Sequence, residues 1–198
     1  MQNHIYPIKD TLLPTSEKSK LLGHKGVVIW MLGLSGSGKS TIARAVENDL
    51  HQHKIHTKLL DGDNLRTGIN NNLSFTDADR MENIRRAAEV SKLFVENSEV
   101  VICSLISPTE EIRNMAKNII GAENFKEVYI NAPFDVCAQR DVKGLYKKAL
   151  AGEIKNFTGL DSPFEEPKNP FVELKTNELS LQECKDILVN KILEIIKL

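Results

Sequence analysis

The sequence has few cysteines and no pattern that would put them to use. Its three cysteines, Cys103, Cys137 and Cys184, are far apart and odd in number, and neither a C-x-x-C pair nor a histidine cluster accompanies them. Disulfide frameworks and zinc sites both need closely patterned ligands. The sequence therefore argues against both kinds of site and favours a reducing compartment.

Glycine, proline and an excess of one charge are also scarce. The 198 residues include eleven glycines and seven prolines, too few for a collagen-like or linker-dominated chain, and 41% of the residues are hydrophobic, too many for a disordered one. The 26 Lys and Arg nearly balance the 27 Asp and Glu, whereas duplex binding needs a cationic excess. We therefore expect one packed domain that binds a small molecule and no nucleic acid.

Long apolar runs are missing as well. No stretch approaches the roughly 20 apolar residues that a membrane span requires. The first 25 residues mix polar and charged side chains and contain no apolar core of the kind that a secretory signal has. We therefore expect a cytoplasmic protein without membrane contact.

What the sequence does contain is an alternation of apolar runs and amphipathic stretches. Continuous, often β-branched runs predict buried strands at 27–32, 58–60, 100–103 and 127–130. Apolar residues at helical spacing predict helices at 40–50, 79–97, 110–120, 135–140 and 179–198. The alternation predicts an α/β fold, a parallel β-sheet flanked by helices on both faces. Residues 141–175 break it with repeated Gly and Pro, which predicts a mobile lid and loop.

A phosphate-binding motif follows the first predicted strand. The run is Gly33-Leu34-Ser35-Gly36-Ser37-Gly38-Lys39-Ser40, a full G-x-x-x-x-G-K-[ST] between a strand and a helix that continues with Thr41. Its glycines let backbone N–H groups point at phosphate oxygens, Lys39 reaches the β- and γ-phosphates, and Ser40 offers a hydroxyl to Mg²⁺. The motif predicts a nucleoside triphosphate site, yet it does not distinguish a kinase from a GTPase or a mechanical ATPase.

The carboxylates must make that distinction. The third predicted strand runs into Ser104-Leu105-Ile106-Ser107, so the usual Walker-B aspartate is missing there, and Asp61-Gly62-Asp63 after the second strand is the expected replacement. If this segment stays extended, both carboxylates point to one side about 6 to 7 Å apart. Asp61 would then hold Mg²⁺-bound water and Asp63 would face an acceptor hydroxyl. The alternative is a D-G turn with solvated carboxylates.

Several further blocks point to one family. Gly62-Asp63-Asn64-Leu65-Arg66 precedes a Phe-x-Asp-Ala-Asp-Arg-x-Glu-Asn-Ile-Arg-Arg run at 75–86, and Ile106-Ser107-Pro108, the run at 140–149 and Asn156-Phe157-Thr158-Gly159 follow. Together these blocks resemble the adenylyl-sulfate kinase family, P-loop kinases that phosphorylate the ribose 3′-hydroxyl of adenosine 5′-phosphosulfate (APS) with ATP and Mg²⁺. The resemblance spans about residues 24–195. It implies an N-terminal extension at 1–23 and a P-loop kinase domain at 24–198, with a lid at about 141–160.

The resemblance also implies roles for individual residues. Motifs and resemblance together place catalysis on Lys39, Asp61, Asp63 and Ser107, and acceptor binding on Asp63, Asn64, Arg66, Phe75, Arg80, Asn83, Ile106, Ser107, Lys143, Leu145 and Phe157. Arg66, Arg80 and Asn83 would hold the phosphosulfate and ribose, because an anionic acceptor suits forked guanidinium contacts. Phe75 and Phe157 would clamp the acceptor adenine. Arg140 would carry the ATP adenine, whereas Arg85 and Arg86 are expected on a solvated helix face.

Two roles are open for Ser107. Some descriptions of the family make this serine a phosphorylated intermediate, but no adjacent His or Lys would activate it, which favours substrate contact and direct in-line transfer. The sequence departs from the family at Thr67 and Leu150, where His and Arg are common.

Partners and rival functions follow from the same comparison. Family members are commonly dimers, so we expect a homodimer, and an ATP sulfurylase is a candidate functional partner. The alternative enzyme is a small-molecule kinase that acts on a nucleoside or sugar. The alternative from another class is a nucleotide-dependent switch or assembly ATPase. It would need a guanine-selecting N-K-x-D or an arginine presented by a partner, and the sequence contains no N-K-x-D.

Overall fold

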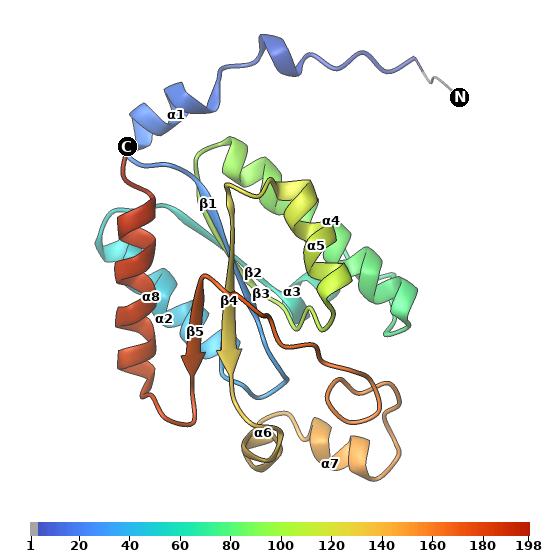
Figure 1. The fold of residues 1–198 in the computed structure, drawn as a ribbon. Helices are drawn as coiled ribbons and strands as arrows, with labels where there is room; N and C mark the ends of the chain where they lie inside the picture. Colours follow the sequence, from blue (N-terminus) through green and yellow to red (C-terminus); the bar gives the residue numbers. More distant parts are fainter. Residues whose placement is uncertain (1–3) are drawn as a thin grey trace.

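Five parallel strands form one sheet, in the order β2-β3-β1-β4-β5, in the computed structural model, which describes residues 4–198 (Figure 1). The strands are β1 (Val27–Leu32), β2 (Thr57–Asp61), β3 (Val100–Ser104), β4 (Phe125–Asn131) and β5 (Val172–Lys175). The helices are η1 (Lys9–Thr11), α1 (Thr15–Leu22), α2 (Lys39–Gln52), α3 (Gly62–Arg66), α4 (Asp77–Glu96), α5 (Glu110–Ile120), α6 (Phe134–Arg140), α7 (Leu145–Leu150) and α8 (Leu181–Ile195). The predicted α/β fold is confirmed.

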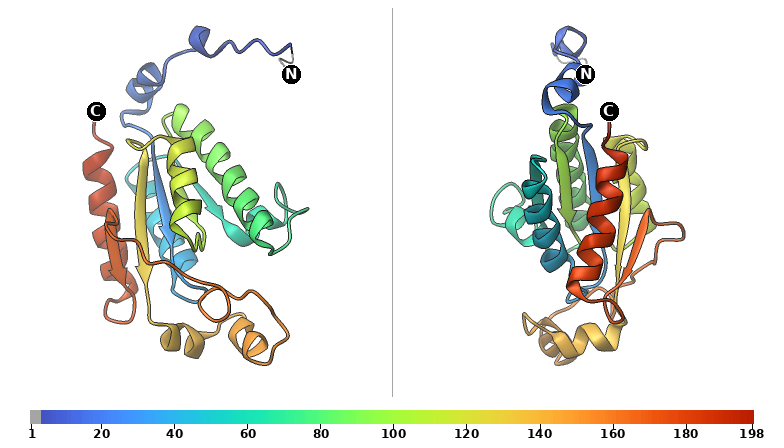
Figure 2. Two further views of the ribbon diagram at one scale, coloured as in Figure 1. Left: turned by 45° about the vertical axis from the view of Figure 1, so that its right-hand side comes forward. Right: turned by 90° about the vertical axis from the view of Figure 1, so that its left-hand side faces the viewer.

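The central strand β1 shows why the sheet needs helices on both faces. All six of its residues are buried. Val27, Ile29 and Met31 pack with α2 and α8, and Val28 and Trp30 pack with α4 and α5 on the opposite face (Figure 2). Because successive side chains of a strand point to opposite faces, a continuous apolar run fills two cores at once.

The strand and helix predictions hold with small shifts at the ends, and two expectations need correction. The segment after β2 is not extended: Asp61 ends the strand and Asp63 lies in the first turn of α3. The second correction concerns residues 141–175, predicted as lid and loop, which contain the helix α7 and the edge strand β5. β5 reads Val-Glu-Leu-Lys, and its short alternation of buried and exposed residues was masked by the prolines before it.

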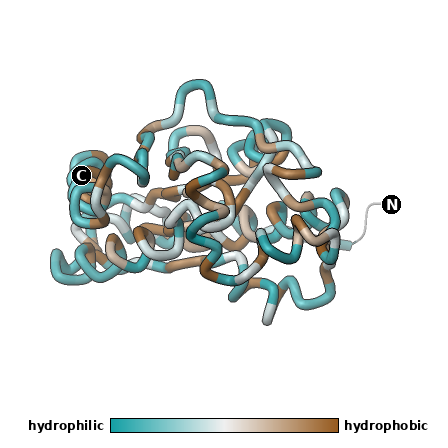
Figure 3. Tube along the Cα trace, turned by 90° about the horizontal axis from the view of Figure 1, so that it is seen from below, coloured by the Kyte–Doolittle hydropathy of each residue, from teal (hydrophilic) through white to brown (hydrophobic). Residues whose placement is uncertain are grey.

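The segments with predicted chemistry gather at one end of the sheet. The phosphate loop, α3 and α6 follow the carboxyl ends of β1, β2 and β4, and α7 follows α6. Helices α6 and α7 lie at the lower end of Figure 1. Open α/β sheets bind their ligands at this edge. Viewed from that end, hydrophobic residues concentrate in the interior and the outer turns are hydrophilic (Figure 3). Within residues 4–198 no helix has the length and apolar character to cross a membrane.

The predicted N-terminal extension begins with residues 1–3, which lie outside the described residues. Its helix α1 lies at the amino ends of the strands, away from the phosphate loop (Figure 1). The Ser19 and Ser98 hydroxyls are 2.8 Å apart, and the Thr15 hydroxyl donates to the Glu96 carbonyl. The apolar side chains before α1 are largely exposed, with Tyr6 82% exposed.

Candidate active site

The phosphate loop leaves β1 through a glycine that no other residue could replace. Gly33 has a φ of 146°, and a Cβ there would collide with the Ile130 carbonyl oxygen. The loop then closes around the Lys39 side chain, whose amine donates to the carbonyls of Gly33 at 2.9 Å and Leu34 at 2.7 Å. Burial lowers the pKa of Lys39 to about 8. The buried Lys39 amine has lost its hydration and can bind phosphate oxygens in place of water.

Ser40 and Asp61 form an oxygen cluster beside the loop. The Ser40 hydroxyl donates to Asp61 Oδ2 at 2.7 Å and lies 3.2 Å from the Ser104 hydroxyl. The other carboxylate oxygen of Asp61 accepts the Asp63 N–H at 3.0 Å and so caps α3. Across residues 4–198 no group of three or more His, Cys, Asp or Glu has the arrangement of a metal site. A hydroxyl and one carboxylate fit Mg²⁺, which takes its remaining ligands from phosphates and water.

Asp63 faces the lid segment. Its carboxylate pairs with the Lys143 amine, and both side chains are more than half exposed. Lys143 precedes Gly144, whose φ of 66° turns the chain into α7. Asn64 is exposed on α3, which ends at Arg66 with Thr67 as its C-cap. The predicted acceptor carboxylate thus lies within reach of the predicted lid cation.

Two arginines lie close together, and the carboxylates of Asp79 and Asp63 also lie near the first of them, Arg66. Arg66 donates to the carbonyls of Leu73 and Ser74, and its guanidinium lies 4.3 Å from the centre of the Phe75 ring. Burial and the positive charge of Arg80 lower the pKa of Arg66. Like charges brought together at a partly buried position mark a site built for an anion.

Arg80 also connects the two segments that carry the predicted adenine clamp. It donates to the Phe75 carbonyl at 3.0 Å, to the Thr158 hydroxyl at 2.8 Å and to the Asn156 carbonyl. Phe75 is 61% exposed, whereas Phe157 is 8% exposed and packs edge-on against Tyr146, with the ring centres 4.9 Å apart. The segments are brought together, but the Phe75 ring is exposed under the Arg66 guanidinium, whereas the Phe157 ring is part of a small core.

Two buried asparagines pair, Asn83 on α4 and Asn70 in the turn after α3. Asn70 Nδ2 donates to Asn83 Oδ1 at 2.9 Å, which leaves the Asn83 amide NH₂ as the group with a free donor. Asn70 was not among the predicted residues, because a single asparagine in a turn carries no signal of burial. Arg85 and Arg86 both pair with Glu82 on α4. Arg85 is exposed, but Arg86 is only partly exposed and also donates to the Ile69 carbonyl and to Asn72 Oδ1, so a solvated face does not describe it fully.

Ser107 is buried rather than open to solvent. It is 1% exposed, has a left-handed φ of 46°, and its hydroxyl accepts the Trp30 indole N–H at 3.0 Å. The neighbouring Ile106 carbonyl accepts the Gly33 N–H at 3.4 Å. The acceptor loop, residues 105–108, therefore touches the phosphate loop directly.

The opposite side of the phosphate loop is held by α6 and α7. Arg140 donates to the Thr176 hydroxyl at 3.0 Å and to its carbonyl at 2.7 Å, and the same hydroxyl donates to the Ser37 carbonyl. The Tyr146 hydroxyl donates to the Ser35 carbonyl at 2.8 Å, with Leu145 packed in the same cluster. Tyr146 and Thr176 were missed by sequence reasoning, since neither belongs to the motif it supports.

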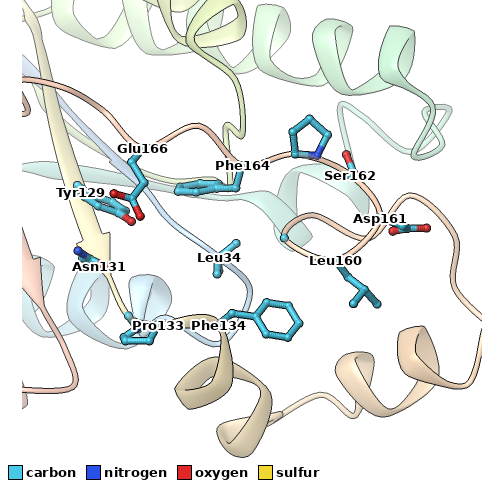
Figure 4. A pocket seen from close by; sticks show the side chains of 13 residues that line it. Leu34, Tyr129, Asn131, Pro133, Phe134, Leu160, Asp161, Ser162, Phe164 and Glu166 are labelled. Carbon is cyan, nitrogen blue, oxygen red and sulfur yellow. The ribbon is translucent and has the colours of Figure 1, made fainter.

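A cavity of about 510 Å³ opens beside this region (Figure 4). Leu34, Tyr129, Phe134 and Phe164 form its apolar walls, with the Tyr129 and Phe164 rings stacked at 6.0 Å. No lysine, arginine or histidine lines it. The cavity therefore lacks the positively charged side chains found at the phosphate loop and at Arg80.

Comparisons with known proteins agree with this geometry. The adenylylsulphate kinase family model matches residues 25–175. An adenylyl-sulfate kinase of Bacteroides thetaiotaomicron is 53% identical over 195 residues, which cover 98% of this chain and 95% of the relative.

Solved structures of the same kind superpose on this chain. The Mycobacterium tuberculosis APS kinase CysC in complex with AMPPNP and APS has a TM-score of 0.81 and 43% identity, covering 85% of this chain and 98% of that one. A hexameric APS kinase from Thiobacillus denitrificans has a TM-score of 0.66 and 26% identity, covering 87% of this chain and 29% of that one. A matching family model over most of the chain, with this level of identity over nearly all of it, shows that the chain belongs to the adenylyl-sulfate kinase family.

Proposed function

We propose that this protein transfers the γ-phosphoryl group of ATP to the 3′-hydroxyl of adenosine 5′-phosphosulfate, giving 3′-phosphoadenylyl sulfate and ADP in sulfate activation. The observation that carries the proposal is the meeting of two sites at one sheet edge. A phosphate loop with a buried lysine contacts the acceptor loop, and Arg66 and Arg80 lie near Asp63. The Mycobacterium tuberculosis relative was solved with an ATP analogue and APS bound, the same pair of nucleotides.

The donor end works through fixed positive charge. Lys39 and the N–H groups of the phosphate loop stabilise the charge that develops on the transferring phosphoryl group. Mg²⁺, when bound, neutralises charge on the β- and γ-phosphate oxygens. Ser40 and Asp61 would hold it, since the Asp61 carboxylate already orients the Ser40 hydroxyl at 2.7 Å.

The acceptor end supplies orientation and a base. Arg66 and Arg80 bind the phosphosulfate, the Asn83 amide donates to the nucleotide, and Asp63 takes the proton from the attacking 3′-hydroxyl. Lys143 pairs with Asp63. When the segment 141–160 closes as a lid, Lys143 stabilises the negative charge of the transferring phosphoryl group. Direct in-line attack needs no covalent step on Ser107. The Ser107 hydroxyl oxygen already accepts a hydrogen bond from the Trp30 indole N–H.

The remaining binding contacts and the organisation of the chain complete the proposal. Arg140 carries the ATP adenine, and Asn64, Ile106 and Leu145 line the acceptor pocket. Residues 24–198 form the kinase domain behind an N-terminal extension at 1–23. The protein works in the cytoplasm as a homodimer, functionally coupled to an ATP sulfurylase.

An acceptor comparison tests the proposed function. ADP release is measured with ATP, Mg²⁺ and, in turn, adenylyl sulfate, adenosine, AMP and a hexose. We expect turnover with adenylyl sulfate at least 100-fold above the others in kcat/KM, because a site with buried polar groups rejects an analogue that leaves them unpaired by about 10⁴ or more. Equal turnover of a nucleoside or a sugar would overturn the proposal.

The two phenylalanines of the clamp make a second prediction. Phe75→Ala should weaken binding of adenylyl sulfate by about 1 to 3 kcal/mol through lost stacking, without lowering stability, because that ring is mostly exposed. Phe157→Ala should weaken the same binding and also destabilise the fold, because Phe157 packs against Tyr146. Calorimetry with each nucleotide and thermal unfolding measure both effects. Equal losses of ATP and acceptor affinity would show that the rings only support the fold.

A further inference from the structure

The acceptor loop is held by groups that belong to neither nucleotide motif. Trp30 on β1 donates its indole N–H to the Ser107 hydroxyl at 3.0 Å. Arg113 on α5 donates from Nη1 to the Ser107 carbonyl at 3.2 Å. Both contacts converge on one residue whose φ of 46° is left-handed, a conformation that a serine keeps only when its surroundings enforce it.

Both anchors are fixed in the core of the protein. Trp30 is fully buried and packs against the Phe125 ring, with ring centres 5.5 Å apart. Arg113 is 4% exposed, and its Nε pairs with Glu127 on β4 at 2.9 Å. Burying a guanidinium is costly unless it is paired and hydrogen-bonded. Arg113 meets this condition with Glu127, and one of its remaining N–H groups donates to the acceptor loop.

The direction of the Trp30 bond decides what the serine can do. An indole nitrogen only donates, so Ser107 Oγ must be the acceptor and its own proton is directed elsewhere. Among the hydrogen bonds found within residues 4–198, none takes that proton. A hydroxyl that accepts one hydrogen bond also becomes a stronger donor. Ser107 is therefore prepared to donate to an oxygen that arrives with the acceptor.

We propose that Trp30 and Arg113 are positioning residues for the acceptor nucleotide. Trp30 orients the Ser107 hydroxyl as a donor to an oxygen of the bound phosphosulfate or ribose, and Arg113 holds the backbone of that residue in its left-handed conformation. The inference rests on the proposed function, because it takes adenylyl sulfate as the molecule that receives the bond.

A double-mutant cycle tests whether Trp30 acts through Ser107. We expect Trp30→Phe and Ser107→Ala each to raise KM for adenylyl sulfate about 3- to 10-fold with KM for ATP unchanged, as the loss of one hydrogen bond predicts. The double variant should be no worse than the more affected single variant. Effects that multiply, or an equal rise in KM for ATP, would overturn the role of Trp30. Ser91→Ala is the matched control, since Ser91 is a fully buried serine bonded to the Ala87 carbonyl and should leave both KM values unchanged.

Fluorescence gives a readout that does not depend on activity. Trp30 is the only tryptophan of the chain, so the emission reports the surroundings of this one indole, its hydrogen bond to Ser107 included. Ser107→Ala should shift this emission in the free protein, and adenylyl sulfate should change it less in the variant than in the wild type. An unchanged emission in Ser107→Ala would overturn the proposed bond. A wild type whose emission changes with adenylyl sulfate but that does not phosphorylate it would instead overturn the proposed function.

Arg113→Lys tests the second anchor. Lysine keeps a positive charge beside Glu127 but lacks the fork that reaches Ser107 at the same time. We expect KM for adenylyl sulfate to rise about 3- to 10-fold while KM for ATP stays the same. A lowered melting temperature with unchanged KM values would mean that Arg113 only stabilises the fold.

Discussion

Replacing Asp63 by asparagine should lower kcat by roughly 10² to 10⁴ while the affinity for ATP stays nearly intact. Asparagine keeps the size of the side chain and its place in the first turn of α3, but it cannot take a proton from the 3′-hydroxyl. Steady-state kinetics with saturating adenylyl sulfate measure kcat, and calorimetry measures ATP binding. A change below threefold would show that Asp63 is not the base.

Lys143→Met separates the base from the ion pair. Because Asp63 pairs with Lys143, a large effect of Asp63→Asn could also arise from a lost partner of the lid. If Asp63 is the base, removing Lys143 should cost much less than removing the carboxylate. Equal losses in the two variants would assign both residues to closure of the lid and would leave the reaction without an identified base.

Lys39→Met should lower kcat/KM for ATP by roughly 10² to 10³, the cost of removing one preorganised donor from a developing charge. Methionine fills nearly the same buried volume, so circular dichroism should show an unchanged fold. The control is Lys58→Met on β2, where the lysine is exposed and no loss is expected. Full activity of Lys39→Met would remove this residue from the phosphate site.

The pH dependence of ATP binding gives the same residue a second test. Burial lowers the pKa of Lys39 to about 8 in the free protein, and bound phosphates favour its charged form. ATP binding therefore takes up a proton when the pH is above this value. The Kd for ATP should be flat below pH 8 and rise up to about tenfold per pH unit above it. In Lys39→Met the same rise should be absent.

The site was predicted from sequence where motif and position agree, and incompletely where the side chains are held by burial. The phosphate loop was recognised because its glycines and lysine follow a wholly apolar strand. The prediction of an extended backbone from Asp61 to Asp63 was wrong, whereas the roles of the two carboxylates stay predictions. The Asp61 carboxylate accepts the Asp63 N–H and so caps a helix that starts at Gly62. An Asp-Gly pair is compatible with a helix start of this kind as well as with a turn.

The groups that the sequence did not reveal share one property. Trp30, Asn70 and Arg113 each make a buried hydrogen bond to a residue of another segment of the chain. Trp30 reads as part of an apolar strand and Arg113 as part of a charged helix surface. The polar atoms of Trp30 and Arg113 meet at Ser107 because β1 and α5 pack in the same core. A pattern of residue types does not show the direction in which these side chains point.

The order of the strands has a consequence for how the chain is made. β1 lies in the middle of the sheet and pairs with β3 and β4, so both edges of the strand at Val28 are covered only after Val101 and Phe125 have been synthesised. Parallel pairing of this kind closes long loops before any contact rewards them, which makes folding slow compared with a helical bundle. A nascent chain that ends before β4 still exposes one edge of its most apolar strand, and until β4 is synthesised that edge is a surface for a chaperone to protect.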